Sequence, residues 1–339
     1  MTPAIFGIAG PQLSADEKAF FQEADPVGYI LFGRNCVDGD QLRRLTNDLR
    51  SIHGRERLLV SIDQEGGRVA RLRPPHWSAY PRGEAFDKLY AIAPTSAIEA
   101  ARVNAHAMAL ELAEFGITVD FHPPLDVRQA GAHDVIGDRA LGGEPRQVAA
   151  LGRAILDGLA KGGVAGCIKH MPGHGRAMCD THKELPTVTA SDEELESDLA
   201  PFRALRDAPI GMTGHLLFTR WDADNPATLS ETVIQQIIRQ RIGFDGLLLT
   251  DDIDMEALDG TVPERSVKAH AAGCDVILNC WAKMDDQIAI TQQLPSLSGK
   301  GAERLERALA GTAIREESDA KAALLAKRDA LLALAGEAA

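Results

Sequence analysis

The chain has 339 residues, of which 45% are hydrophobic and 25% are charged, a composition typical of globular proteins. Its formal net charge of −13 argues against nucleic acids and anionic membrane surfaces as partners, since both require a positively charged binding surface. No apolar run is long enough to span a bilayer, and the N-terminus lacks a basic region followed by an apolar segment. We therefore expect a cytoplasmic protein whose five cysteines, which show no CxxC spacing, are reduced.

Short apolar runs recur along the chain, and each is followed by a longer amphipathic stretch. Strands that alternate with helices form a parallel sheet, and eight such strands close a barrel. We therefore predict a single (β/α)₈ TIM-type barrel domain over residues 1–339, with an open doubly wound sheet as the structural alternative. The eight predicted strands cover residues 4–8, 27–32, 58–63, 118–122, 165–170, 210–215, 246–251 and 275–279.

The segments outside the predicted strands give further expectations. Ser14 and Glu17 have the spacing of a capping box, which predicts a helix start after the first strand. Residues 64–94 are too long and irregular for an ordinary strand-to-helix loop, so we expect them to form part of the active-site rim. Residues 301–339 are rich in alanine and leucine and predict extra C-terminal helices packed on the outside of the barrel.

Polar residues gather where the predicted strands end, which is where α/β barrels place their catalytic groups. Asp251 directly follows three leucines and a threonine, so the fold would hold it rigidly at the mouth of the barrel. We interpret Asp251 as a candidate nucleophile or electrostatic stabiliser. The alternative is a helix N-cap, a role that Asp252 could take instead.

A second candidate group lies in the glycine-rich segment after the fifth strand. Asp180 and His182 are two residues apart there. A carboxylate beside an imidazole orients the ring and raises its pKa, as a general acid near neutral pH requires. The alternative is that both are solvated loop residues.

The histidines of the predicted strand ends also leave a metal site open. His170 and His174 are four residues apart, but Pro172 and Gly173 between them disfavour a helix that would present both on one face. Strand ends and loops could still form a zinc site. The candidate ligands of that site are His170, His174, His182, His215 and Asp251.

A set of charged residues near the predicted strand ends suits a hydroxyl-rich or anionic ligand. Arginine offers several hydrogen-bond donors in a fixed fork, and aspartate can accept from two hydroxyls. The alternative is that these residues form ion pairs at the surface. The sequence alone leaves this alternative open, above all for Arg71. The candidate residues of this clamp are Asp63, Arg71, Arg139 and Lys169.

Several motifs occur in a fixed order along essentially the whole chain. They are DQEGGRV at 63–69, IGDR at 136–139, KHMPGHG at 169–175, DTH at 180–182 and TDDIDM at 250–255. With these motifs the chain resembles glycoside hydrolase family 3. More narrowly, it is similar to the compact bacterial β-N-acetylglucosaminidases of peptidoglycan recycling. The resemblance implies a (β/α)₈ barrel, in agreement with the predicted strands.

The resemblance also implies roles for individual residues. Asp251 would be the nucleophile that forms a covalent glycosyl-enzyme intermediate. His182 would be the general acid and base, with Asp180 as its carboxylate partner, so histidine replaces one acid of the usual two-carboxylate scheme. No metal or other cofactor is implied. The residues that would bind the N-acetylglucosamine unit are Asp63, Arg71, Arg139, Lys169 and His170.

Three positions depart from the family pattern. Met171 stands where the family commonly has phenylalanine, and Thr181 and Thr250 stand where it commonly has serine. These changes are small in size and leave the charged groups in place.

The resemblance predicts a monomeric, retaining exo-β-N-acetylglucosaminidase that releases N-acetylglucosamine from small glycans, the 1,6-anhydro-muropeptides. A β-N-acetylglucosaminide phosphorylase is an alternative, because a histidine acid/base does not repel an incoming phosphate as a glutamate would. A metal-dependent hydrolase on the same barrel is another. A catalytically silent sugar-binding module is disfavoured, since it has no use for both Asp251 and His182.

Overall fold

The computed structural model describes residues 1–55, 57–129, 131, 134–179, 184–314 and 320–337. Its centre is a closed barrel of eight parallel strands in the order β1-β10-β9-β7-β5-β4-β3-β2. The closure confirms the predicted barrel and excludes the open doubly wound sheet. The barrel strands are β1 (Thr2–Gly7), β2 (Pro26–Leu31), β3 (Leu59–Ile62), β4 (Val119–Asp120), β5 (Ala165–Met171), β7 (Ile210–Thr213), β9 (Leu247–Asp252) and β10 (Val276–Asn279).

Each barrel strand overlaps one predicted strand. Most of their residues are buried, because helices cover the outside of the barrel while side chains from opposite strands fill its inside. β4 is the exception in length, since only two residues of the predicted run 118–122 pair with both neighbouring strands. Two further short strands, β6 (Thr187–Val188) and β8 (Leu217–Phe218), form a separate parallel pair that the sequence did not predict.

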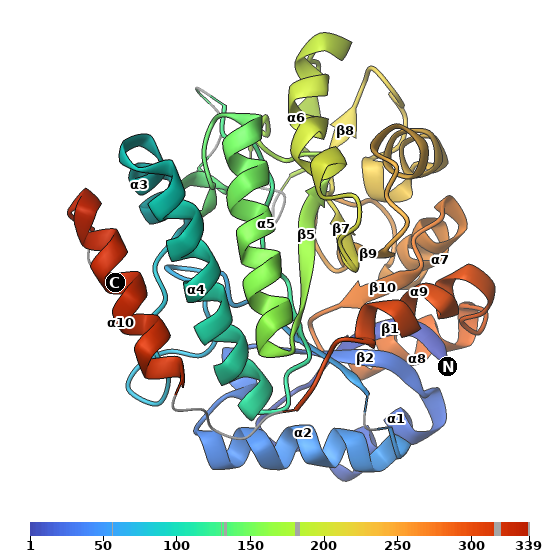
Figure 1. Cartoon of the computed structure of the whole chain (residues 1–339). Coiled ribbons are helices and arrows are strands. Elements are labelled where there is room, and N and C mark those ends of the chain that lie inside the picture. The colour runs from blue at the N-terminus through green and yellow to red at the C-terminus, as the bar shows by residue number, and fades with distance from the viewer. Residues whose placement is uncertain (56, 130, 132–133, 180–183, 315–319, 338–339) are drawn as a thin grey trace.

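Helices that follow the barrel strands form the outer layer of the barrel (Figure 1). The predicted capping box is confirmed at the first of them, where the Ser14 hydroxyl and the Glu17 carboxylate each accept a backbone N–H. The helices are α1 (Ala15–Ala24), α2 (Gly39–His53), α3 (Gly83–Ile92), α4 (Pro94–Glu114), α5 (Pro145–Gly162), α6 (Asp192–Ala204), η4 (Val233–Ile242), α7 (Val262–Ala272) and α8 (Met284–Gln293), with short turns η1 (Gly33–Asn35), η2 (Gly137–Arg139) and η3 (Ala227–Leu229).

The segment between β3 and α4 is irregular only in its first part. Residues 64–82 contain no helix, but α3 occupies most of the remainder, so the prediction of an irregular stretch up to residue 94 was wrong. The apolar residues of α3, among them Phe86 and Leu89, are buried against the rest of the core. The irregular part reaches the mouth of the barrel through Val69 and Arg71, as expected for a rim.

The C-terminal helices pack in two different places. α10 (Ala320–Leu332), which η5 (Ala333–Ala335) follows, lies on the outside against α3 and α4, as predicted. α9 (Gly299–Leu309) does not, because Leu305 and Leu309 pack against the residues that fill the barrel interior. Arg304 of α9 binds Asp275, which precedes β10. α9 therefore closes the end of the barrel opposite the mouth, and the prediction of purely external packing was wrong for this helix.

Two sequence expectations can be compared with the structure directly. All five cysteines are free thiols. In the described parts of the chain, no helix combines the length and the apolar character that crossing a bilayer would need.

Candidate active site

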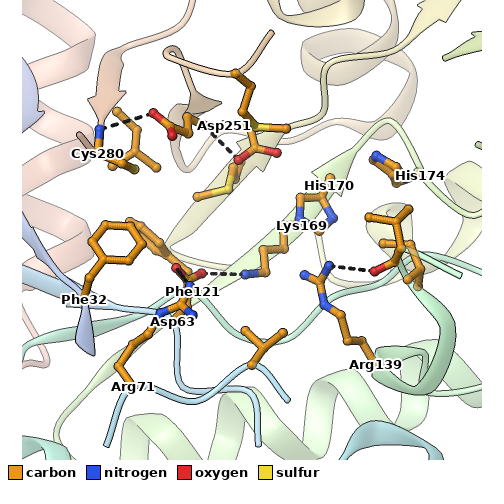
Figure 2. Close-up of a pocket in the computed structure, with 17 residues that line it drawn as sticks. Phe32, Asp63, Arg71, Phe121, Arg139, Lys169, His170, His174, Asp251 and Cys280 are labelled. Atoms are coloured by element: carbon orange, nitrogen blue, oxygen red, sulfur yellow. Dashed lines mark hydrogen bonds and ion pairs between the residues drawn. The ribbon is translucent and has the colours of Figure 1, made fainter. Parts of the chain in front are cut away.

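A pocket of about 170 Å³ opens at the C-terminal ends of the barrel strands (Figure 2). It is smaller than the ~300 Å³ at the lower end of common ligand sites, so it suits one small unit rather than an extended chain. The lining residues come from almost every strand end, which is the usual construction of a barrel site. They are Phe32, Asp63, Val69, Arg71, Phe121, Val135, Ile136, Arg139, Lys169, His170, His174, Met212, Asp251, Asp252, Met255, Leu278 and Cys280.

A continuous set of ion pairs forms one wall of the pocket. Asp63 accepts hydrogen bonds from Lys169 Nζ at 3.0 Å and from Arg71 Nη2 at 3.1 Å. Lys169 Nζ also lies 2.8 Å from Glu65 Oε1. Glu65 in turn accepts from Arg139 Nη2 and Nε at 2.7 and 2.8 Å. The four residues of the predicted clamp are therefore brought together, with Glu65 as a fifth member.

The ion pairs of this wall keep its members charged. Burial opposes charge on Asp63, but Lys169 and Arg71 hold the pKa of Asp63 below its ordinary value. Burial also opposes charge on Glu65. Arg139 and Lys169 nevertheless hold the pKa of Glu65 well below its ordinary value. Burial would lower the pKa of Lys169, but Glu65 and Asp63 raise it above its ordinary value. The wall thus presents fixed donors and acceptors to a ligand.

Glu65 is a site residue that the sequence analysis missed, although it lies inside a quoted motif. Its side chain is 3% exposed and is bidentate to Arg139, a residue 74 positions away. One signal was available in the sequence. The predicted clamp held three cations and only one carboxylate, and buried cations require paired anions.

Asp251 lies at the end of β9 and borders the pocket (Figure 2). Its Oδ1 accepts the backbone N–H of Asp252 at 2.8 Å. Burial opposes ionisation, but His170, His215 and the Asp252 N–H hold the pKa of Asp251 below its ordinary value. Asp251 therefore presents a carboxylate to the pocket at neutral pH.

Asp252 differs from its neighbour in both charge and role. Burial and the nearby Asp254 carboxylate raise the pKa of Asp252. Its Oδ1 accepts the backbone N–H groups of Asp254 and Cys280, each at 3.2 Å. No helix starts here, since the next described helix is α7, so the alternative in which Asp251 or Asp252 is a helix N-cap was wrong. Asp252 instead caps a turn that joins the ends of β9 and β10.

His170 is oriented by a buried carboxylate that the sequence analysis also missed. Asp126 Oδ2 lies 2.7 Å from His170 Nδ1, and Asp126 Oδ1 accepts the N–H groups of His170 and His174 at 3.1 and 2.7 Å. Burial, followed by the nearby His170, lowers the pKa of His174 to about 4, so this ring is neutral at pH 7. Asp126 thus fixes both histidines at the edge of the pocket beside Asp251.

The structure gives two of the proposed zinc ligands, His215 and His170, other partners, whereas within the described residues His174 Nδ1 has none. His215 Nδ1 lies 2.8 Å from Thr228 Oγ1, and its Nε2 lies 2.9 Å from the carbonyl oxygen of Asp252, so both ring nitrogens are engaged. His170 Nδ1 is engaged by Asp126. Within the described residues, no three histidine, cysteine, aspartate or glutamate side chains are grouped so as to hold a metal ion. His182, another of the five candidate ligands, lies outside the described residues.

The predicted acid/base pair cannot be located in the same way. Asp180 and His182 both fall within residues 180–183, which lie outside the described residues. The flanking Cys179 and Glu184 are described, and the short strand β6 follows a few residues later.

The rest of the pocket wall combines Asp251 and Asp252 with apolar and sulfur-containing side chains. Phe32, at the end of β2, has the guanidinium groups of Arg34 and Arg71 at 4.8 and 5.0 Å from its ring centre. The attraction between the guanidinium group of Arg71 and the face of the ring restrains the Arg71 side chain. The remaining apolar and sulfur-containing members of this wall include Met212, Met255, Leu278 and Cys280.

Asp120 is a buried acid just below the pocket. Burial raises the pKa of Asp120 well above its ordinary value, and the carboxylates of Asp63 and Glu65 add to this effect, although the Gln64 N–H and Lys169 oppose it. Asp120 Oδ1 accepts the Gln64 N–H at 2.9 Å, and within the described part of the chain Oδ2 has no partner. Burial therefore favours the protonated, neutral form of Asp120.

We expect the substitution Asp120→Asn to keep kcat/KM within about threefold of the wild-type value, because an amide reproduces a neutral carboxyl group and retains the Oδ1 acceptor. By contrast, Asp63→Asn removes an ionised partner of two cations and should lower kcat/KM by at least about 100-fold. Steady-state kinetics of the two variants on one substrate provide the comparison. Equal losses in both would show that Asp120 is charged.

A family model, curated relatives and solved structures all point to the same family. The model of the family described as "Glycosyl hydrolase family 3 N terminal domain" matches residues 8–310. The β-hexosaminidase of Bordetella pertussis is 36% identical over 316 residues, which cover 91% of this chain and 88% of that protein. NagZ from Neisseria gonorrhoeae in complex with N-trifluoroacetyl-D-glucosamine is similar in structure, with a TM-score of 0.88 and 31% identity over 99% of this chain and 98% of that one. A structure of the same protein with a zinc ion gives a TM-score of 0.86 at 30% identity, again over 99% and 98% of the chains.

Proposed function

Because the chain belongs to glycoside hydrolase family 3 and is a β-hexosaminidase of that family, we propose that it is a retaining exo-β-N-acetylglucosaminidase. One observation above all supports this proposal. Asp251 is an ionised carboxylate on a rigid strand end, and it borders a pocket whose other side offers charged groups for sugar hydroxyls. We propose that residues 1–339 form one catalytic domain.

In the proposed first step the sugar is held and attacked. The groups that would bind N-acetylglucosamine are Asp63, Arg71, Arg139, Lys169 and His170, all of which border the pocket. The Asp251 carboxylate attacks the anomeric carbon while the bond to the leaving oxygen breaks. His182 donates a proton to that oxygen, and Asp180 stabilises the imidazolium that supplies it.

In the second step the glycosyl–Asp251 ester is hydrolysed. The now neutral His182 takes a proton from a water molecule, which attacks the anomeric carbon and releases the Asp251 carboxylate. Two displacements at one carbon restore the original configuration, so the product is the β-anomer. His182 ends protonated, ready for the next substrate.

The substrate proposal rests on the size of the pocket and on the relatives. A pocket of about 170 Å³ accepts one terminal unit, which favours exo-action. NagZ from Neisseria gonorrhoeae binds an N-acylated glucosamine, which supports N-acetylglucosamine as that unit. On the motif resemblance we propose 1,6-anhydro-muropeptides as the natural substrate, and a monomer that acts in the cytoplasm during cell-wall recycling.

Turnover of an aryl β-N-acetylglucosaminide, beside the matching β-glucoside, tests this function. We expect hydrolysis of the N-acetyl substrate only, with no change on adding a chelator and no dependence on phosphate. Formation of a sugar phosphate would instead identify a phosphorylase. The assay includes a chelator because a structure of gonococcal NagZ contains a zinc ion. Loss of activity on adding the chelator would contradict a mechanism without a metal.

His182→Ala should lower kcat/KM by about 10²–10⁴-fold on substrates with poor leaving groups, because these depend on proton donation. The loss should be much smaller with an aryl leaving group of low pKa, since that oxygen departs without a proton. The measurement is a plot of log kcat/KM against leaving-group pKa, which should be steeper for the variant. Parallel plots for both enzymes would contradict the acid role of His182.

A further inference from the structure

Gln64 follows Asp63 at the end of β3 and is 1% exposed. Its side-chain amide makes three hydrogen bonds to one short piece of backbone. Oε1 accepts the N–H groups of Arg71 and Leu72 at 2.8 and 3.1 Å, and Nε2 donates to the Leu72 carbonyl at 2.9 Å. The Gln64 N–H donates to Asp120. The residue thus ties the irregular segment after β3 back to the barrel.

Arg71 depends on this tie for its place in the pocket. It lies in the part of the chain, residues 64–82, where no helix fixes the backbone. Its guanidinium contacts Asp63 and lies over the ring of Phe32, but both contacts are made by the far end of a long side chain. The two hydrogen bonds that Gln64 accepts from the backbone of Arg71 and Leu72 hold the near end.

We propose that Gln64 is a positioning residue that sets the affinity for the sugar by holding Arg71 at the pocket wall. This inference rests on the proposed role of Arg71 as a sugar ligand. Gln64 itself does not border the pocket, so it acts through Arg71 rather than on the substrate.

The effect should fall on binding rather than on the chemical step. Asp251 is placed by β9, and in the described part of the chain no hydrogen bond joins it to Gln64 or to residues 71–72. Loss of a contact made equally in the ground state and the transition state raises KM and leaves kcat unchanged.

The first test is Gln64→Met, which keeps the length of the side chain and removes its hydrogen bonds. We expect KM for an aryl β-N-acetylglucosaminide to rise about 10- to 100-fold, with kcat within about threefold, because a hydrogen bond from a charged donor to the sugar is worth about this much. A KM within about twofold of the wild-type value would overturn the proposal.

Gln41 supplies a matched control, since it is also a buried glutamine that ties down a loop. Its Nε2 donates to the carbonyls of Pro11 and Asn35, and its Oε1 accepts the Val37 N–H. None of these residues borders the pocket. Gln41→Met should therefore lower the melting temperature without the rise in KM. A similar rise in KM in this control would assign the effect to general loosening and overturn the proposal.

A second variant, Gln64→Glu, covers the case in which Gln64→Met fails to fold. A protonated glutamic acid has one donor and one acceptor and so replaces the amide, whereas an ionised glutamate cannot donate to the Leu72 carbonyl. We expect its KM, relative to wild type, to fall as the pH is lowered from about 8 to about 5. A ratio that stays constant across this range would count against the proposal.

A double-mutant cycle separates this proposal from the proposed function. Arg71→Ala should raise KM, and adding Gln64→Met to it should change KM no further, because Gln64 acts through Arg71. Independent, multiplicative effects would overturn the proposal for Gln64 alone. An unchanged KM in Arg71→Ala would instead remove Arg71 from the sugar ligands, which is a failure of the proposed function.

Discussion

Replacing Asp251 with alanine is expected to lower kcat/KM for an aryl β-N-acetylglucosaminide by about 10⁴-fold or more, the scale seen when a covalent nucleophile is lost. The carboxylate is held by β9 and kept ionised by His170 and His215, although burial opposes its charge. Without it, neither the attack on the anomeric carbon nor the stabilisation of positive charge there remains. Kinetics at equal concentrations of folded enzyme, checked by thermal unfolding, measure the effect.

A small anion should partly replace the missing carboxylate. Azide can enter the space that Asp251→Ala opens and attack the anomeric carbon in a single displacement. We therefore expect azide to raise the rate of the variant and to give the α-glycosyl azide, since one displacement inverts the configuration. Near-wild-type turnover in the variant without azide would contradict the nucleophile role of Asp251.

Replacing Lys169 with methionine should lower the free energy of unfolding by about 3 kcal/mol, because it leaves buried carboxylates short of a cation. The Lys169 side chain is 2% exposed and lies 3.0 and 2.8 Å from the carboxylates of Asp63 and Glu65. In the variant, Asp63 and Glu65 each still bind one arginine. The expected loss of stability is therefore at the lower end of the range usual for broken buried ion pairs. Chemical denaturation measures it, and KM should rise in parallel.

A partly exposed lysine offers the matched comparison. Lys321 also pairs with a buried glutamate, Glu111, but its own side chain is 24% exposed and water can replace it. Lys321→Met should therefore lower the free energy of unfolding by about 1 kcal/mol or less. Restoring the charge balance with Lys169→Met/Glu65→Gln should recover part of the stability. Equal losses in the two lysine variants would show that burial of the charges is not the cause.

The strands were predictable because both faces of each one are buried. Runs such as residues 246–251 are short and rich in apolar residues, and turn residues flank them. This pattern can be recognised without knowing which strands are the neighbours. The position of α9 was not predictable in the same way. Its apolar residues Leu305 and Leu309 indicate that the helix must pack, but they do not indicate whether it packs beneath the barrel or beside it. Similarly, α3 was missed within the stretch judged irregular.

Pocket residues were predictable from the sequence where a charged residue lies directly at the end of a predicted strand. Asp63, Lys169 and Asp251 follow this rule. Residues that act as partners were missed, because Glu65 and Asp126 bind side chains 74 and 44 positions away in sequence. Gln64 was missed for the opposite reason, since its partners are local backbone groups that leave no mark in the sequence. The assignment of Asp180 and His182 stays a prediction, as both lie outside the described residues.

Trapping the covalent intermediate in which the sugar is bound to Asp251 is the sharpest test of the proposed retaining mechanism. A ring-fluorinated N-acetylglucosaminyl fluoride slows the hydrolysis of a glycosyl-enzyme more than its formation, so the adduct accumulates. Mass spectrometry of the digested wild-type enzyme should then place one glycosyl unit on Asp251, within the motif at residues 250–255. An adduct on another residue, or an inactive enzyme without any adduct, would overturn the assignment of Asp251 as the nucleophile.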